Sequence, residues 1–328
     1  RQHYSEPPET PAPLYDYLAK PLPTPRPRPD RGTYVRRPPR QHYSKAAHKL
    51  PDPPWHLDRI NQRAPALDGN TTPNFAAPAT HPVTIYVLDG LLDPAANPEE
   101  FGGVEISVGK VLAGGRNASV AGCGAHANDV AALAPGRVSG SAPASTRIRH
   151  VRVLNCLGGT DCATAAAGLH WILSDYTASK SSAAASGHPF FPAIASLSVV
   201  SPTPCQELEP AVAALASAGV LSVVAAGNSA RNACELSPGS APGALAVGAV
   251  DRSNRVWRKS NFGRCVGLDA PGVGVGVPSS AAGEVIRGGE EGGGGREVDG
   301  TSLAAPVVAG VAARELAALP WLGAGELR

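Results

Sequence analysis

Ser302 is the residue whose sequence context is best suited to a nucleophile. It lies in segment 300–306, GTSLAAP, where a tight turn leads into an apolar, alanine-rich run. Its small neighbours would let a substrate backbone approach closely. We expect residues 303–319 to form a buried helix whose amino end, with free N–H groups and the positive end of its dipole, would stabilise an oxyanion beside Ser302. A helix cap is the alternative for a Gly-Thr-Ser sequence on its own.

Three further polar residues follow segments that are typical of an α/β protein. Asp89 follows the apolar run 83–88, which predicts a buried parallel strand, and Asn228 comes after a similar run at 220–224. His126 ends the small-residue turn CGAH, before a segment that predicts a helix. Seen singly, Asp89 is a candidate helix cap, His126 a hydrogen-bonded histidine and Asn228 a turn residue. Together, Asp, His and Ser follow one of the known chain orders of a catalytic triad.

These motifs resemble those of the subtilase family of serine peptidases, and within it the branch that contains proteinase K. The GTSxAAP motif is the most specific, with Leu303 in place of the usual Met. Supporting segments are PWHLDRI at 54–60, VRVLNC at 151–156, AAGN at 225–228 and NFGRC at 261–265. The resemblance implies one α/β domain over residues 54–328, with a doubly wound, mostly parallel sheet and helices on both faces. A last segment that relatives carry is missing, so we expect a truncated C-terminus.

The resemblance implies a serine endopeptidase that forms an acyl-enzyme. Ser302 would attack the scissile carbonyl, His126 would take its proton, and Asp89 would orient the imidazole. The side-chain amide of Asn228 would donate to the oxyanion.

Two segments are expected to hold an extended substrate peptide by backbone pairing, because each follows a buried strand. These segments are Gly158-Gly159-Thr160 and Ser196-Leu197-Ser198. The usual SLGG sequence of the specificity pocket reads SLSV here, with Ser198 and Val199 replacing glycines. We therefore expect a narrower pocket that favours smaller side chains.

Other departures from the family pattern surround the acid and the base. Gly90 stands where a hydroxyl residue usually follows the acid, and Asn128 and Asp129 replace small residues after His126. A carboxylate so close to an imidazole would raise its pKa or crowd the site. Asp299 precedes the Ser302 motif, where a neutral residue is familiar. Two alternatives therefore remain: a degenerate subtilase with the fold but little activity, and a module that binds extended peptides.

The six cysteines indicate an oxidising compartment if they are paired. The resemblance implies bridges that involve Cys123 with Cys156, and Cys234 with Cys265. Cys162 and Cys205 each follow a proposed substrate-holding segment, so a third bridge would tie the two walls of the cleft together. Two free, partly buried thiols are the alternative. The cysteines and the family together predict a secreted or extracytoplasmic protein, and two N-x-S/T triplets, at 70–72 and 117–119, agree with secretion.

Composition separates residues 1–53 from the rest of the chain. This part is rich in proline and arginine and contains the sequence RQHYS twice, so we expect an extended tail or linker. The net charge of +2 for the 328 residues hides this basic excess. We predict no nucleic-acid binding and no membrane span. The resemblance implies a monomer that acts on proteins or peptides, with an inhibitory pro-domain outside this chain. The triad requires no metal, and one common calcium site of the family is expected to be lost at Gly267.

Overall fold

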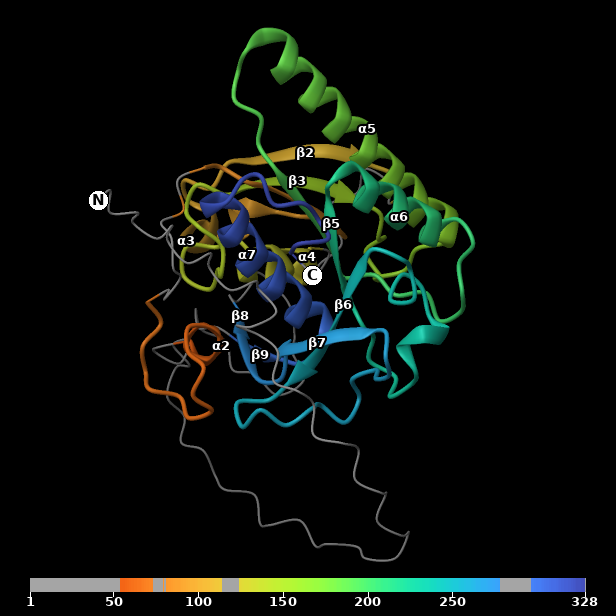
Figure 1. The fold of residues 1–328 in the computed structure, drawn as a ribbon. Helices are drawn as coiled ribbons and strands as arrows, with labels where there is room; N and C mark the ends of the chain where they lie inside the picture. Colours follow the sequence, from red (N-terminus) through yellow and green to blue (C-terminus); the bar gives the residue numbers. More distant parts are fainter. Residues whose placement is uncertain (1–53, 73–78, 80, 114–123, 278–295, 328) are drawn as a thin grey trace, which may run out of the picture.

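The computed structural model describes residues 54–72, 79, 81–113, 124–277 and 296–327 (Figure 1). The predicted tail at 1–53, Cys123 and the second N-x-S/T triplet lie outside these residues.

Seven parallel strands form the central sheet, which confirms the predicted fold class. Their sequences are mostly apolar and rich in β-branched residues, and the inner strands are buried along nearly their whole length. In sheet order they are β2 (Ile106–Val111), β3 (Arg147–Arg152), β1 (Thr84–Asp89), β4 (Ala193–Leu197), β5 (Leu221–Ala225), β6 (Ala244–Val250) and β7 (Val266–Pro271).

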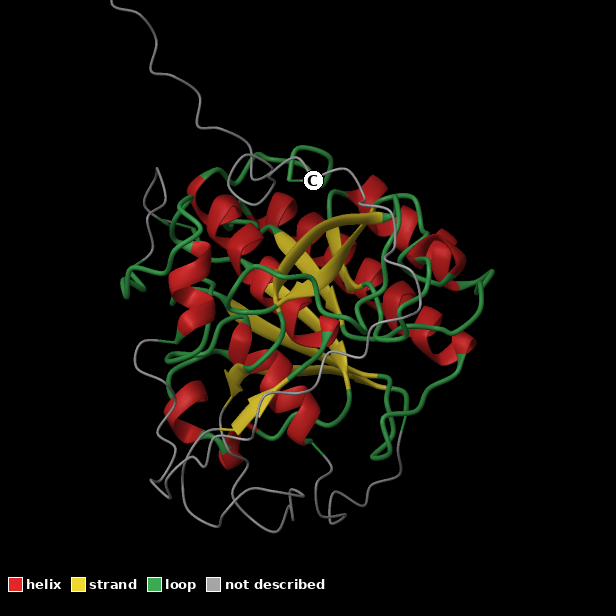
Figure 2. Ribbon diagram, turned by 90° about the horizontal axis from the view of Figure 1, so that it is seen from below, coloured by secondary structure: helices red, strands yellow, loops and turns green. Residues whose placement is uncertain are grey.

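Helices cover both faces of the sheet (Figure 2). On one face α4 (Ala125–Leu133) and α7 (Thr301–Ala318) pack against alternate strand residues such as Ile85 and Val87. On the other face α5 (Cys162–Ser186) and α6 (Leu208–Ala218) pack against the residues between them, such as Tyr86 and Leu88. This alternation follows from the two-residue period of a strand.

Shorter elements complete the described part of the domain. The hairpin of β8 and β9 packs near the start of α7, where Val275, Val277 and Leu303 share a small core. The bounds are α2 (Trp55–Ile60), η1 (Pro94–Ala96), α3 (Pro98–Phe101), η2 (Ala233–Glu235), β8 (Val275–Val277) and β9 (Arg296–Val298).

Helix α5 is much longer than the sequence predicts. The sequence predicts a helix over 163–174 and, from its serine- and alanine-rich composition, a surface insertion at 179–186, but the helix continues to Ser186. Its outer half is exposed, so the hydrophobic pattern stops there while the alanines and Lys180 still favour helix. It ends at Gly187, whose φ of 69° is a left-handed conformation that suits glycine.

The strand order reverses beside β1, which creates a crevice at the carboxyl ends of the strands. The chain passes from β1 to β2 and β3 on one side, and continues through β4 to β7 on the other. Ligands of open α/β sheets bind at such a switch point. Asp89 is the last residue of β1, and Ser198 follows the last residue of β4.

Candidate active site

A cavity of about 470 Å³ lies at this end of the sheet and brings together residues from distant parts of the sequence. His126, Asn228 and Ser302 all line it. They come from α4, from the turn after β5 and from the start of α7. The topology of the sheet thus brings residues that are 102 and 74 positions apart in the sequence to one cavity.

Asp89 and His126 form a pair. His126 Nδ1 lies 2.9 Å from Asp89 Oδ1, which also accepts a hydrogen bond of 2.6 Å from the backbone N–H of Gly90. Asp89 is fully buried, whereas 48% of the His126 side chain is exposed. The neutral imidazole then carries its proton on Nδ1 and leaves Nε2 available as a base.

The pKa of His126 is raised to about 9, chiefly by the negative charge of Asp89. Burial opposes this rise, and the hydrogen bond with Asp89 adds to it. Asp129 raises the pKa further, and Arg296 lowers it. The imidazole is therefore mainly protonated at neutral pH in the absence of substrate.

The two residues after His126 that depart from the family pattern each have polar partners outside α4. Asn128 Oδ1 accepts a hydrogen bond of 2.8 Å from Asp93 N–H, and its amide donates to Asp93 O and Asn97 Oδ1 at 2.7 Å. Asp129 forms a largely buried ion pair with Arg296 of β9. Asn128 thus ties α4 to the loop that follows the acid, and Asp129 ties it to the hairpin.

Thr301 fixes the orientation of Asn228, a role that the sequence did not reveal. Asn228 Oδ1 accepts hydrogen bonds from Thr301 N–H at 3.0 Å and from Thr301 Oγ1 at 2.7 Å. Thr301 Oγ1 in turn accepts from Gly227 N–H at 3.0 Å. With its oxygen held in this way, the amide nitrogen of Asn228 is the group left to donate into the cavity.

Gly300 leaves open the space between the polar groups of Ser302 and Asn228. A Cβ atom at residue 300 would lie 2.9 Å from Ser302 Oγ, 3.6 Å from Asn228 Nδ2 and 3.7 Å from Ser302 N. One hydroxyl and two N–H donors therefore border a single point. This arrangement suits attack on a carbonyl whose oxygen becomes negative.

The predicted substrate-holding segments differ in their access to the cavity. Gly158, Gly159 and Thr160 line it, in a turn where Asn155 Oδ1 accepts the Leu157 and Gly159 N–H groups at 2.9 and 3.0 Å. Of the second segment only Ser198 lines the cavity, followed by Val199. Ser196 and Leu197 are fully buried inside β4.

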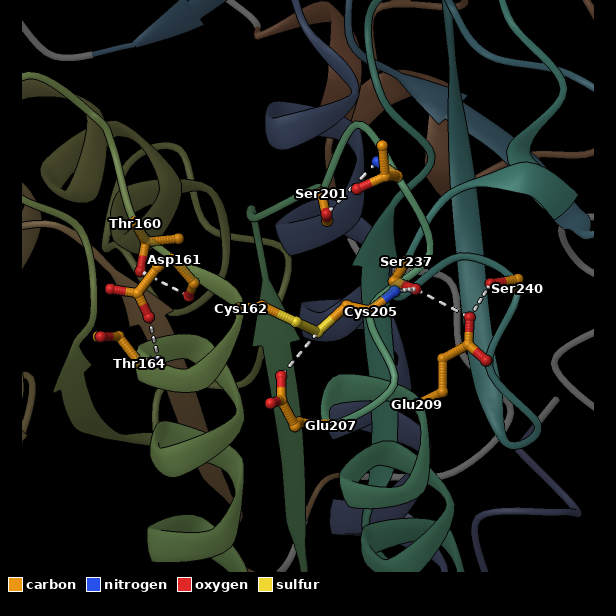
Figure 3. Close-up of a disulfide and its surroundings, with 11 residues drawn as sticks. Thr160, Asp161, Cys162, Thr164, Ser201, Cys205, Glu207, Glu209, Ser237 and Ser240 are labelled. Carbon is orange, nitrogen blue, oxygen red and sulfur yellow. Dashed lines mark hydrogen bonds between the residues drawn. A yellow bond between two sulfur atoms is a disulfide. The ribbon is translucent and has the colours of Figure 1, made fainter.

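A disulfide joins the two sides of the cavity. Cys162 opens α5 just after Thr160, and it is bonded to Cys205, three residues after Pro202, which lines the cavity (Figure 3). The Cα atoms are 6.0 Å apart, within the range that a bridge requires.

The other cysteines lie elsewhere in the domain. Cys234 is bonded to Cys265, with a Cα separation of 5.2 Å. The bridge expected between Cys123 and Cys156 involves a residue outside the described part of the chain, so this pairing stays a prediction.

Clusters of side chains that could bind a metal ion are rare among the described residues. Within them, one cluster of potential ligands is found, formed by Cys162, Cys205 and Glu207, but its two sulfur atoms belong to the disulfide. Gly267 lies in β7 and offers no side-chain ligand. Among the helices described, none combines the length and the apolar character that crossing a membrane requires.

The chain belongs to the subtilase family, whose model matches residues 104–328. It is 33% identical over 259 residues to the alkaline serine exoprotease A of Vibrio alginolyticus, covering 79% of this chain and 42% of that protein. It is also 33% identical over 263 residues to an extracellular serine proteinase of Thermus sp. (strain Rt41A), covering 79% and 56%. The chain thus spans about half the length of the curated relatives that it matches.

Solved structures show the same likeness. A cold-adapted subtilisin-like serine proteinase superposes with a TM-score of 0.67 at 30% sequence identity, covering 84% of this chain and 89% of that one. A mutant of the protease domain of PatA superposes with a TM-score of 0.56 at 27% identity, covering 72% and 79%.

Proposed function

We propose that this protein is a serine endopeptidase of the subtilase family. Ser302 is the nucleophile, His126 the general base and acid, and Asp89 the residue that orients the imidazole. The observation that carries the proposal is the single cavity lined by His126, Asn228 and Ser302, with His126 paired to buried Asp89. Relatives named as serine proteinases support the same activity.

The reaction proceeds in two stages. Ser302 Oγ attacks the peptide carbonyl while His126 Nε2 takes the hydroxyl proton, and the tetrahedral intermediate carries its negative charge on the former carbonyl oxygen. Asn228 Nδ2 and the Ser302 N–H donate to that oxygen, in the space that Gly300 leaves open. The C–N bond then breaks, and His126 returns the proton to the leaving amine. Water repeats the sequence on the ester and releases the acid, with His126 again as the base.

Substrate binding follows from the walls of the cavity. An extended peptide pairs through its backbone with segment 158–160 and with Ser198, the part of the second segment that lines the cavity. Ser198 and Val199 fill space next to the scissile bond, which favours small side chains there. The disulfides and the extracellular relatives support an extracytoplasmic location. Membership of the proteinase K-like branch and the loss of one common calcium site at Gly267 stay predictions.

A fluorophosphonate probe tests the proposal directly, because it reacts covalently with an activated serine. We expect labelling at Ser302 in the wild-type protein, none in Ser302→Ala, and slower labelling by at least 100-fold in His126→Ala. Circular dichroism of each variant shows that the fold is retained. Folded wild-type protein that is not labelled and does not cleave a casein substrate would contradict the proposal, and would favour a degenerate or peptide-binding subtilase.

A further inference from the structure

Pro306 removes a hydrogen bond from the backbone of the residue proposed as nucleophile. In an α-helix, the carbonyl of each residue accepts from the N–H four residues later. Pro306 lies four residues after Ser302 inside α7 and has no N–H. The Ser302 carbonyl therefore lacks its donor in the helical ladder, in the first turn of a helix that is buried along most of its length.

Ser198 supplies a donor from another element. Its Oγ donates a hydrogen bond of 2.9 Å to the Ser302 carbonyl, across a sequence separation of 104 residues. Ser198 follows β4 directly, so its position is set by a buried strand in the middle of the sheet. The hydrogen bond links this rigid strand to the first turn of α7.

We propose that Ser198 is a positioning residue for Ser302, an inference that rests on the proposed function. Ser302 carries both the attacking hydroxyl and one N–H donor to the oxyanion, so a shift of its backbone moves both groups at once. Displacements of about 1 Å can cost roughly 100-fold in rate. By holding the carbonyl of the same residue, Ser198 fixes the direction in which Oγ and N–H point into the cavity.

Ser198 also lines the cavity, so a role as a wall must be separated from the role as a hydrogen-bond donor. A wall contact acts on substrate binding and changes KM, whereas a positioning contact acts on the chemical step and changes kcat. The two roles also depend on different atoms. The β-carbon shapes the wall and is kept in the Ser198→Ala variant, while the hydroxyl alone reaches the Ser302 carbonyl.

The test compares Ser198→Ala with Ser198→Thr and with the matched control Ser201→Ala. Ser201 lies three residues later, does not line the cavity, and accepts from Thr203 N–H at 3.5 Å. We expect Ser198→Ala to lower kcat and the rate of fluorophosphonate labelling by about tenfold, with KM changed less than twofold. Ser198→Thr should retain most of the wild-type kcat and labelling rate because it keeps the hydroxyl. Ser201→Ala should change neither.

The outcomes separate the two proposals. An active wild type in which Ser198→Ala leaves kcat and the labelling rate unchanged, or changes KM alone, overturns the positioning role and leaves the proposed function standing. A folded wild type without labelling overturns both.

A second variant tests the link with Pro306. Pro306→Ala supplies the missing N–H to the Ser302 carbonyl, so Ser198→Ala made in that background should lower the labelling rate less than threefold. Such non-additivity is the sign of two residues that serve the same contact. An equal loss in both backgrounds would overturn the explanation through Pro306.

Discussion

Asp89 holds His126 through one carboxylate oxygen, and its second oxygen has a different environment. Oδ1 receives both His126 and the Gly90 N–H, whereas Oδ2 is buried with no hydrogen-bond partner in the part of the chain described. The family pattern places a hydroxyl residue where Gly90 stands. The residue that lacks this hydroxyl therefore directly follows the carboxylate whose Oδ2 has no partner. The negative charge of Asp89 is the largest cause of the raised pKa of His126.

This electrostatic arrangement predicts an alkaline activity profile. A base with a raised pKa is free to accept a proton only when it is deprotonated, so kcat/KM should rise with pH with a midpoint near pH 9. Removal of the nearby negative charge in Asp129→Asn should move the midpoint to lower pH. Removal of the positive charge in Arg296→Gln should move it to higher pH.

Initial rates across pH 6 to 10 with one peptide substrate measure both shifts. Melting temperatures serve as the control, because each substitution breaks a largely buried ion pair. Midpoints that move in the same direction in both variants would contradict this electrostatic account.

Gly300 borders the space proposed for the oxyanion, and a larger residue there should block it. In Gly300→Ala the new methyl group would stand 2.9 Å from Ser302 Oγ and 3.6 Å from Asn228 Nδ2, in the space that the proposed mechanism assigns to the substrate oxygen. We expect kcat/KM to fall at least 100-fold, a loss similar to that from removing an oxyanion donor. Gly325→Ala is the matched control, since no atom lies within 4 Å of the added carbon. Activity within threefold of wild type in Gly300→Ala would mean that the oxyanion lies elsewhere.

At the scale of elements, the disulfide between Cys162 and Cys205 holds the two walls of the cavity. It fixes the start of α5 relative to the loop before α6, and each end adjoins a segment that lines the cavity. Ser237 adds a second restraint, because its Oγ accepts the Cys205 N–H at 2.8 Å and donates to Glu209 Oε1 at 2.8 Å (Figure 3). A looser wall would bind an extended peptide less well but would leave the triad in place.

Replacing both cysteines by serine should therefore raise KM for a long peptide substrate severalfold, with a smaller change in kcat. The Cys234 and Cys265 pair is the control, because the two bridges close loops of similar length, with sequence separations of 43 and 31 residues. Loss of either bridge should cost about 2–4 kcal/mol of stability. Steady-state kinetics and thermal melts measure the two effects. Equal KM values in the two double variants would contradict a role of the first bridge in substrate binding.

The sequence predicted those elements whose pattern is local. Apolar runs identified the strands near 83–88 and 220–224, because buried parallel strands are hydrophobic on both faces. The exposed half of α5 was missed, since alanine and serine on a solvated helix carry no periodic signal.

Contacts within the site also divide into those within a local sequence motif and those between residues far apart in the sequence. The motif around Ser302 is local and could be read from the sequence, and so could candidates for the acid and base. Thr301 with Asn228, Ser198 with Ser302 and Asp129 with Arg296 are 73, 104 and 167 residues apart. Such pairs are set by the packing of the sheet and helices, which no local pattern encodes.

At the scale of the whole domain, α2 attaches the first described segment to the β8–β9 hairpin and the first half of α7, because Trp55 shares a core with Val275 and Leu303. Trp55 Nε1 donates a hydrogen bond of 2.7 Å to Gly274 O, and His56 Nε2 contacts Ser139 O at 2.8 Å. Asp58 accepts the Gly69 N–H at 2.9 Å. All three side chains are almost fully buried, so α2 is part of the domain core.

The burial of His56 predicts that the domain loses stability in acid. Its folded pKa is lowered to about 4, mainly by burial, from an ordinary value of 6.5. Between these values the unfolded chain binds a proton at His56 that the folded domain excludes, so the contribution of His56 lowers stability as pH drops from about 6.5 to 4 and changes no further below pH 4. The loss is on the order of 3 kcal/mol.

His56→Gln keeps a donor for Ser139 O but does not titrate, so its melting temperature should vary less with pH than that of the wild type. His188→Gln, at an exposed position, should retain the wild-type slope. All melts are made in the Ser302→Ala background, which avoids self-cleavage and isolates this effect. Parallel curves with and without the His56→Gln substitution would show that His56 does not set the acid limit.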